Sequence, residues 1–209
     1  MQKALFLDLD GTLANSVTAM REVYFAFLTR FGAEGNTAEF LRLNGPPLIR
    51  IVEILKGAHN LPDRSEELLA VYSAMIRQVH ETAPPAKGAQ DLLKYARRKG
   101  WNVAVVTSSP RHLALRWLIR TGLSSRVDVV VGGDEVACGK PAPDPYTLAL
   151  SRVHCTATES LAVEDSRIGA LSAVSAGLPT WVLAAPSDRR DWPTEVRFIT
   201  DLTDLMEMI

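Results

Sequence analysis

Residues 4–12 have the sequence Ala-Leu-Phe-Leu-Asp-Leu-Asp-Gly-Thr, and they carry the strongest structural signal in the chain. The run from Ala4 to Leu9, followed at once by acid and glycine, is typical of a buried parallel strand. Asp8 and Asp10 are two residues apart, so both carboxylates lie on the same side of an extended chain. Gly11 then permits a sharp turn. The stretch therefore predicts a strand whose carboxyl end presents two acids.

Apolar runs of the same kind recur along the chain and predict four further strands, at residues 103–106, 127–131, 161–163 and 180–183. Segments with helical periodicity lie between them, at residues 89–99, 111–121, 145–153 and 168–176. Strands that alternate with helices of this length are typical of an α/β protein. We therefore expect a Rossmann-like, doubly wound parallel sheet.

The stretch from residue 16 to about residue 83 contains no convincing strand. It predicts amphipathic helices at 17–31, 48–56 and 66–79, separated by glycine and proline. We therefore expect two parts, an α/β core formed by residues 1–14 and 84–209 and an α-helical cap formed by residues 15–83. Because the insert begins just after the first strand, the cap should lie over the end of that strand.

The composition of the 209-residue chain is that of a folded globular protein, with 47% apolar residues and 22% charged residues. A net charge of −1 gives no general attraction to nucleic acids or acidic membranes. No secretory signal or membrane span is visible, and the two cysteines have no metal-ligand spacing. We expect a cytoplasmic protein, monomeric or weakly dimeric, with no nucleic-acid or membrane partner.

Polar side chains follow the first four predicted strands, at the strand ends where a parallel sheet binds its ligands. Three carboxylates, a lysine and hydroxyl groups would meet there, and such a set suits phosphate chemistry with Mg²⁺ as the neutralising cation. Asp8 could attack phosphorus, Asp10 could serve as acid and base, and Lys140 could add a fixed positive charge. The candidate metal ligands are Asp8, Asp165 and Glu164, and the candidate phosphate-binding groups are Thr107, Ser108 and Lys140.

Four short motifs occur in order along almost the whole chain: Asp8-Leu9-Asp10-Gly11-Thr12-Leu13, Thr107, Lys140-Pro141 and Glu164-Asp165-Ser166. They resemble the four signatures of the haloacid dehalogenase superfamily. The helical insert resembles the cap of the phosphoglycolate phosphatase and β-phosphoglucomutase branch. The resemblance implies magnesium and a phosphoaspartate intermediate. It also implies that Asp10 gives its backbone carbonyl to the metal while its side chain transfers protons.

We therefore expect a magnesium-dependent phosphatase that hydrolyses a small phosphorylated metabolite. One alternative is a β-phosphoglucomutase-like sugar phosphomutase, because Glu164-Asp165-Ser166 followed by Gly169 resembles the mutase form. Pro46-Pro47-Leu48 resembles the phosphatase form instead. A second alternative is a non-catalytic binding module that has kept the fold.

The turn at Asn44 and Gly45 is the sharpest break inside the insert, and we expect these two residues to contact the substrate. Arg42 and Arg50 flank this turn. They could be solvated helix ends, or they could face a substrate with a second anionic group. We expect structural or surface roles for the four histidines, and a solvated charge pair at residues 189 and 190.

Overall fold

The computed structural model describes residues 3–62, 64–185 and 192–209, so residues 189 and 190 lie outside the described part. Within it, six strands form one parallel sheet with the order β3-β2-β1-β4-β5-β6. The strands are β1 (Ala4–Leu7), β2 (Asn102–Val106), β3 (Val129–Val131), β4 (Ser160–Glu164), β5 (Thr180–Leu183) and β6 (Arg197–Ile199). The predicted doubly wound α/β fold is confirmed.

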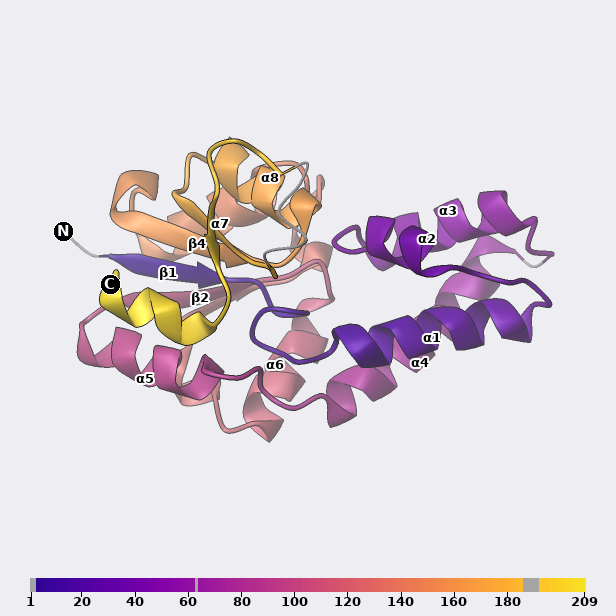
Figure 1. Ribbon diagram of the computed structural model, residues 1–209, viewed down its shortest axis with the longest axis horizontal. Coiled ribbons are helices and arrows are strands. Elements are labelled where there is room, and N and C mark those ends of the chain that lie inside the picture. The colour runs from indigo at the N-terminus through magenta and orange to yellow at the C-terminus, as the bar shows by residue number, and fades with distance from the viewer. Residues whose placement is uncertain (1–2, 63, 186–191) are drawn as a thin grey trace.

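Helices cover both faces of this sheet (Figure 1). On one face lie α5 (Ala89–Arg98), α6 (Arg111–Arg120) and the C-terminal 3₁₀ helix η5 (Leu202–Glu207). On the other lie α7 (Asp144–Val153) and α8 (Arg167–Ser175). The single-turn 3₁₀ helices η1 (Ser124–Arg126), η2 (Gly133–Glu135) and η3 (Ala157–Glu159) lie in the connections.

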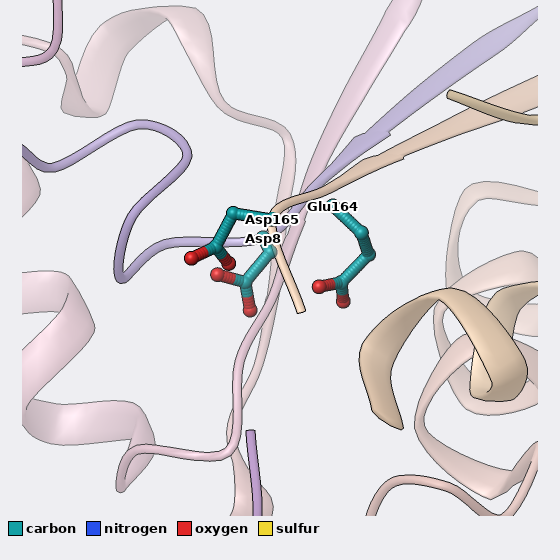
Figure 2. A group of neighbouring side chains, drawn as sticks. All are labelled: Asp8, Glu164 and Asp165. Carbon is teal, nitrogen blue, oxygen red and sulfur yellow. The ribbon is translucent and has the colours of Figure 1, made fainter. Parts of the chain in front are cut away.

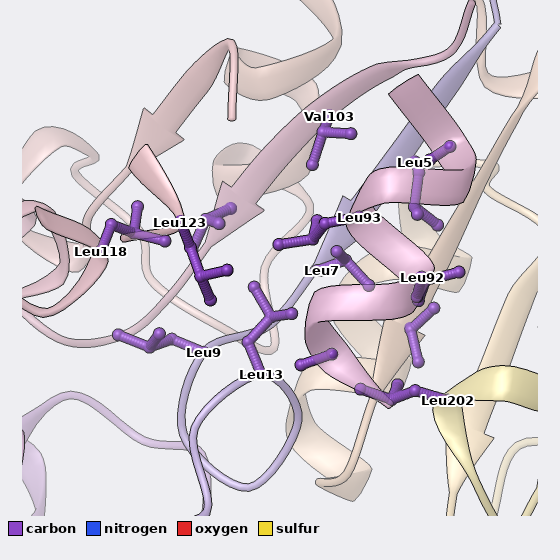
Figure 3. Packing of buried hydrophobic residues seen from close by; sticks show 14 of the residues in the cluster. Leu5, Leu7, Leu9, Leu13, Leu92, Leu93, Val103, Leu118, Leu123 and Leu202 are labelled. Carbon is purple, nitrogen blue, oxygen red and sulfur yellow. The ribbon is translucent and has the colours of Figure 1, made fainter. Parts of the chain in front are cut away.

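The central strand β1 is apolar throughout because helices pack on both of its faces. Leu5 and Leu7 point into the cluster formed with α5, α6 and η5, where Figure 3 shows them against Leu92 and Leu93. Phe6 points the other way, and its ring meets Tyr146 of α7 edge-on. The core thus holds β1 rigidly at the point where it delivers Asp8.

The strand order changes direction at β1, with β2 and β3 on one side and β4, β5 and β6 on the other. Open α/β sheets bind ligands at such a switch point, beyond the carboxyl ends of the strands. Leu7 pairs with Val105 on one side and with Val163 on the other. The residues that follow these three positions in each strand therefore come out level at the same edge.

The chain between β1 and α5 forms α1 (Val17–Arg30), α2 (Thr37–Arg42), α3 (Leu48–His59) and α4 (Ser65–Thr82). These helices share a hydrophobic cluster of their own, which includes Tyr24, Phe27, Val52, Leu55, Leu68 and Tyr72. In Figure 1 they extend away from the sheet, beyond the end of β1. They form the predicted helical cap.

The two links between cap and sheet run side by side. The amide of Asn15 donates to the carbonyl of Pro84 at 2.9 Å, and the amide of Ala86 donates to the carbonyl of Leu13 at 2.7 Å. The end of α4 is also held by α6, since Nε1 of Trp117 donates to the carbonyl of Ala83 at 2.9 Å. We propose from these contacts that the boundaries lie where the sequence places them, with residues 15–83 as the cap.

Besides the 3₁₀ helices, one α-helix and one strand of the described residues were not predicted from the sequence. Helix α2 has only six residues, and Asn36 caps it by accepting from the amide of Glu39 at 2.9 Å. Strand β6 has three residues, and its Arg197 is exposed. Both are too short to show a periodic apolar pattern, and only the Asn36 and Glu39 spacing marks α2 as a helix start. The remaining predicted strands and helices occur with ends shifted by a few residues.

None of the described helices combines the length and the apolar character that a membrane crossing requires.

Candidate active site

Three carboxylates meet at the switch point of the sheet. Asp8 follows β1, while Glu164 ends β4 and Asp165 follows it. Each offers an oxygen that lies within 4.8 Å of the others. Figure 2 shows the carboxylates of Asp8 and Asp165 side by side, with that of Glu164 on the far side of Asp8. The predicted acidic cluster is therefore present, and adjacent parallel strands assemble it.

Lys140 lies beneath this cluster and is 4% exposed. Its Nζ donates to Oδ1 of Asp8 at 2.7 Å, to Oε1 of Glu164 at 2.5 Å and to the carbonyl of Val106 at 2.9 Å. The hydroxyl of Tyr146 donates to the same Glu164 oxygen at 2.7 Å. All three protons of the ammonium are used, so Lys140 holds Asp8 in a fixed orientation.

The electrostatic balance of the cluster is uneven, because three acids share one ammonium. Burial alone would lower the pKa of Lys140, but Asp8 and Glu164 hold it above its ordinary value. Burial, reinforced by Glu164 and Asp165, raises the pKa of Asp8 well above its usual range despite the attraction of Lys140. Burial and Glu164 together raise the pKa of Asp165 to about 7. The cluster therefore favours a further cation.

The chemistry of these donors fits a divalent metal. Their oxygens are the hard ligands that Mg²⁺ prefers, and a few carboxylates suffice because this ion keeps several waters. Lys140 donates a hydrogen bond to Oδ1 of Asp8, and Asn44 donates one to Oδ2 of Asp165. No hydrogen bond within the described residues goes to the second oxygen of either aspartate, so both acids retain an oxygen for a metal.

Asp10 has a partner that sequence reasoning missed. Nε2 of His80 lies 3.0 Å from Oδ1 and 3.1 Å from Oδ2 of Asp10. Ser16 donates to Oδ1 at 3.0 Å and Ser109 donates to Oδ2 at 2.9 Å. The prediction that every histidine is merely structural or at the surface overlooked this contact with a candidate catalytic acid.

A signal for His80 was present in the sequence. It follows Tyr72 and Ile76 at intervals of four residues, so it lies on the buried face of α4, and it is 3% exposed. Burial alone would lower the pKa of His80, but the charge of Asp10 and the hydrogen bond to it keep that pKa raised. Burial alone would raise the pKa of Asp10, but His80, Ser109 and Ser16 keep it lowered. A titratable group on an apolar helix face was the available clue.

The cap turn touches the core at the predicted place. Nδ2 of Asn44 donates to Oδ2 of Asp165 at 3.0 Å, and Oγ of Ser108 donates to the carbonyl of Gly45 at 2.6 Å. Gly45 has φ +106°, a conformation that side-chain-bearing residues rarely adopt. The turn therefore lies directly over the carboxylates. The Ser108 hydroxyl bonds to the cap, while the buried Thr107 hydroxyl accepts from the amide of Ser109 at 3.0 Å.

A cavity of about 750 Å³, counting the part open to solvent, separates the cap from the strand ends. Seven of the nine predicted site residues line it, namely Asp8, Asp10, Asn44, Gly45, Thr107, Ser108 and Asp165. Lys140 and Glu164 are buried behind Asp8. Arg42 and Arg50 do not line the cavity. Both are exposed, and Arg50 pairs with Glu53, so of the two expectations for these arginines the structure supports the solvated one.

The comparisons with known proteins agree with this geometry. The family model of the haloacid dehalogenase-like hydrolases matches residues 5–183. The chain belongs to the haloacid dehalogenase-like hydrolases. Its place is in the branch that contains phosphoglycolate phosphatase and β-phosphoglucomutase. A divalent metal is implied by membership of this family, and the acidic cluster around Asp8 could bind it.

Relatives of this haloacid dehalogenase-like hydrolase include several phosphatases. A plasmid-encoded phosphoglycolate phosphatase of Cupriavidus necator is 30% identical over 84% of this chain and 78% of its own length. The bifunctional riboflavin kinase/FMN phosphatase of Arabidopsis thaliana is 26% identical over 90% of this chain, which spans about half (49%) of that longer protein. Crystalline CbbY of Rhodobacter sphaeroides, in complex with phosphate, superposes with a TM-score of 0.81 at 25% identity, covering 98% of this chain and 96% of CbbY.

Proposed function

We propose that this protein is a magnesium-dependent phosphatase that hydrolyses a small phosphorylated metabolite through a phosphoaspartate on Asp8. The observation that carries the proposal is the buried contact of Lys140 with Asp8, which orients this carboxylate toward the cavity shared with Asp10. A relative that is 30% identical is a phosphatase, which supports the same reaction class.

In the first half of the reaction, a carboxylate oxygen of Asp8 attacks phosphorus, and the bond from phosphorus to the leaving oxygen breaks. Asp10 gives a proton to that oxygen, so the leaving group departs as a neutral alcohol. Because the pKa of Asp10 is lowered, this proton comes through Asp10 from His80, which lies 3.0 Å away and has a raised pKa. Lys140 stabilises the negative charge shared by Asp8 and the phosphoryl oxygens. Backbone amides after Thr107 would donate to the same oxygens.

In the second half, Asp10 is ionised and takes a proton from a water molecule that attacks the phosphoaspartate. The bond between phosphorus and the Asp8 oxygen breaks, inorganic phosphate leaves, and the carboxylate of Asp8 is restored. Asp10 passes this proton on to His80, which restores the charged pair for the next turnover. His80, Ser16 and Ser109 hold its carboxylate between the two steps.

The carboxylates of Asp8 and Asp165 would hold the Mg²⁺, together with the backbone carbonyl of Asp10. Both oxygens of Glu164 already accept hydrogen bonds, from Lys140 and Tyr146 on one and from Ser166 on the other, so Glu164 would support the site through Lys140. The bound ion would neutralise the phosphate and let an anionic substrate approach an acidic cluster. Asn44, which reaches Asp165 from the cap, would link the metal site to closure of the cap.

Two alternatives receive less support. A phosphomutase must hold a doubly phosphorylated sugar, yet none of the described residues that line the cavity is a lysine, arginine or histidine. A non-catalytic binding module has no need for a nucleophile, an acid and a lysine in contact. The cytoplasmic location and the monomeric or weakly dimeric state remain predictions.

The test is hydrolysis of 4-nitrophenyl phosphate with and without Mg²⁺, comparing the wild type with Asp8→Asn. We expect the variant to lose all measurable turnover while its circular dichroism and melting temperature stay native-like. Asp91→Asn, on the exposed face of α5, is the matched control and should keep full activity. Near wild-type activity of Asp8→Asn would exclude the covalent mechanism.

A further inference from the structure

We propose that the leaving group of the natural substrate is uncharged and largely apolar, and that it fills the cap half of the cavity. The inference rests on the proposed phosphatase activity and names the class of substrate. It narrows that class to phosphate monoesters of bulky apolar or aromatic alcohols and excludes those with a second phosphate or a carboxylate.

The cavity has two chemically different halves. The core supplies the polar half, with carboxylates and hydroxyls that serve the phosphoryl group and its metal. The cap supplies a wall of apolar side chains from its four helices, and Figure 1 shows these helices beyond the end of β1. Its principal members are Phe40 of α2, Leu48 and Ile51 of α3, and Tyr72 and Ile76 of α4.

None of the described cap residues that line the cavity carries a charge. Arg42 and Arg50 point to solvent, and His80 is already paired with Asp10. A second carboxylate or phosphate on the leaving group would therefore be desolvated against apolar side chains with no cation to pair with. Burying an unpaired charge is strongly unfavourable, so such substrates should bind poorly.

The extent of the apolar wall points the same way. A very small leaving group would leave this wall in contact with water, whereas an apolar ring or branched chain would cover it. The free energy gained on binding rises with the apolar area that the ligand removes from water. The rings of Phe40 and Tyr72 suit a flat or aromatic group.

The wall offers one neutral polar group. Tyr72 is 4% exposed and lines the cavity, and its hydroxyl makes no hydrogen bond to any described residue. Burial is the main cause that raises the pKa of Tyr72, so this hydroxyl stays protonated and can donate. It could bind one uncharged oxygen on the leaving group, which adds selectivity without requiring charge.

The experiment compares two aryl phosphates of nearly equal shape, 4-isopropylphenyl phosphate and 4-carboxyphenyl phosphate. The carboxylate stabilises the departing phenolate by resonance, so intrinsic reactivity does not favour the isopropyl ester. We expect kcat/KM to be at least tenfold higher for the isopropyl ester. Equal values, or a preference for the carboxylated ester, would overturn the inference.

Two variants, each with a control substitution at the neighbouring residue, test whether the apolar wall causes the preference for the isopropyl ester. Leu48→Lys introduces a cation into the cavity and should shift the ratio at least tenfold toward the carboxylated ester, while Ile49→Lys, whose side chain is exposed and outside the wall, should not. Phe40→Ala should lower kcat/KM for the isopropyl ester, while Leu41→Ala, 63% exposed, should not. If each variant and its control behave alike, the wall does not select the leaving group.

Binding of non-hydrolysable analogues separates this inference from the proposed function. The probes are 4-isopropylbenzylphosphonate and 4-carboxybenzylphosphonate, titrated by calorimetry in the presence of Mg²⁺. Tenfold tighter binding of the isopropyl compound supports the apolar subsite. If neither ester is hydrolysed in that case, only the proposed phosphatase activity is contradicted. If both esters are hydrolysed and both analogues bind with equal affinity, the phosphatase proposal stands and only the apolar subsite is contradicted.

Discussion

Nε2 of His80, in the last turn of the cap helix α4, lies 3.0 Å from Oδ1 of Asp10, which follows the first strand of the sheet. Seventy residues separate the two in sequence. His80 is buried and Asp10 is half-buried, and their contact joins the cap to the group proposed to transfer protons. His80 thus affects both the orientation of Asp10 and the ease with which Asp10 gains a proton.

Removal of His80 should slow turnover more than it weakens substrate binding. We expect His80→Leu to lower kcat by roughly 10- to 100-fold, as the loss of a supporting hydrogen bond to a catalytic group commonly does, with little change in KM. His80→Gln can still donate one hydrogen bond to Asp10 and should recover part of the loss. Steady-state kinetics on 4-nitrophenyl phosphate would measure both. His112→Gln, exposed on α6, is the control, and equal loss in all three variants would contradict the assignment.

The pair should also produce a defined pH dependence of stability. The pKa of His80 is raised, so its contribution is complete below about pH 6.5 and is lost as pH rises through the folded-state value. The pKa of Asp10 is lowered, so its contribution is complete above about pH 4 and is lost as pH falls through the folded-state value. The difference in melting temperature between wild type and His80→Leu, measured in EDTA, should therefore be largest between about pH 4 and pH 6.5. A difference that does not vary with pH would show that the pair is not charged.

Metal binding should release protons near neutral pH. Burial and Glu164 raise the pKa of Asp165 to about 7, so a metal at this site must displace a proton at pH 6.5. Ionised Asp165 also penalises the folded state as pH rises toward 7, and Mg²⁺ should offset this penalty. Calorimetry in two buffers with different heats of ionisation would count the protons. We expect release in the wild type, less in Asp165→Asn, and wild-type release in Asp91→Asn.

Loss of Lys140 should cost stability as well as activity. Lys140→Met leaves Asp8 and Glu164 buried without their shared cation, and breaking a buried pair in this way costs about 3–5 kcal/mol. The additional change Glu164→Gln removes one of the two unpaired charges and should restore part of that loss. Urea unfolding in EDTA would compare the three proteins. A double variant no more stable than Lys140→Met would show that repulsion between the acids is not the cause.

The sequence alone determined the sheet and the acids at its edge. Runs such as residues 103–106 are apolar because both faces of their strands are covered. A short stretch of sequence is therefore enough to show where such a strand lies. Asp8, Asp10 and Asp165 each come at the end of an apolar run, so their meeting follows from strand direction alone. Lys140 instead lies in the loop between β3 and α7, and its side chain reaches Asp8 from there. The short elements α2 and β6 could not be predicted in this way, because neither is long enough to show a periodic apolar pattern.

Only the tertiary structure decided what surrounds those acids. The contact between His80 and Asp10 depends on how α4 ends against Trp117 and Arg120 of α6, and no local pattern specifies that docking. The same packing turns Arg42 to solvent and Phe40 toward the cavity, although the two are close in sequence. A helical period shows which residues share a face, but the partner of that face is chosen by contacts between distant segments.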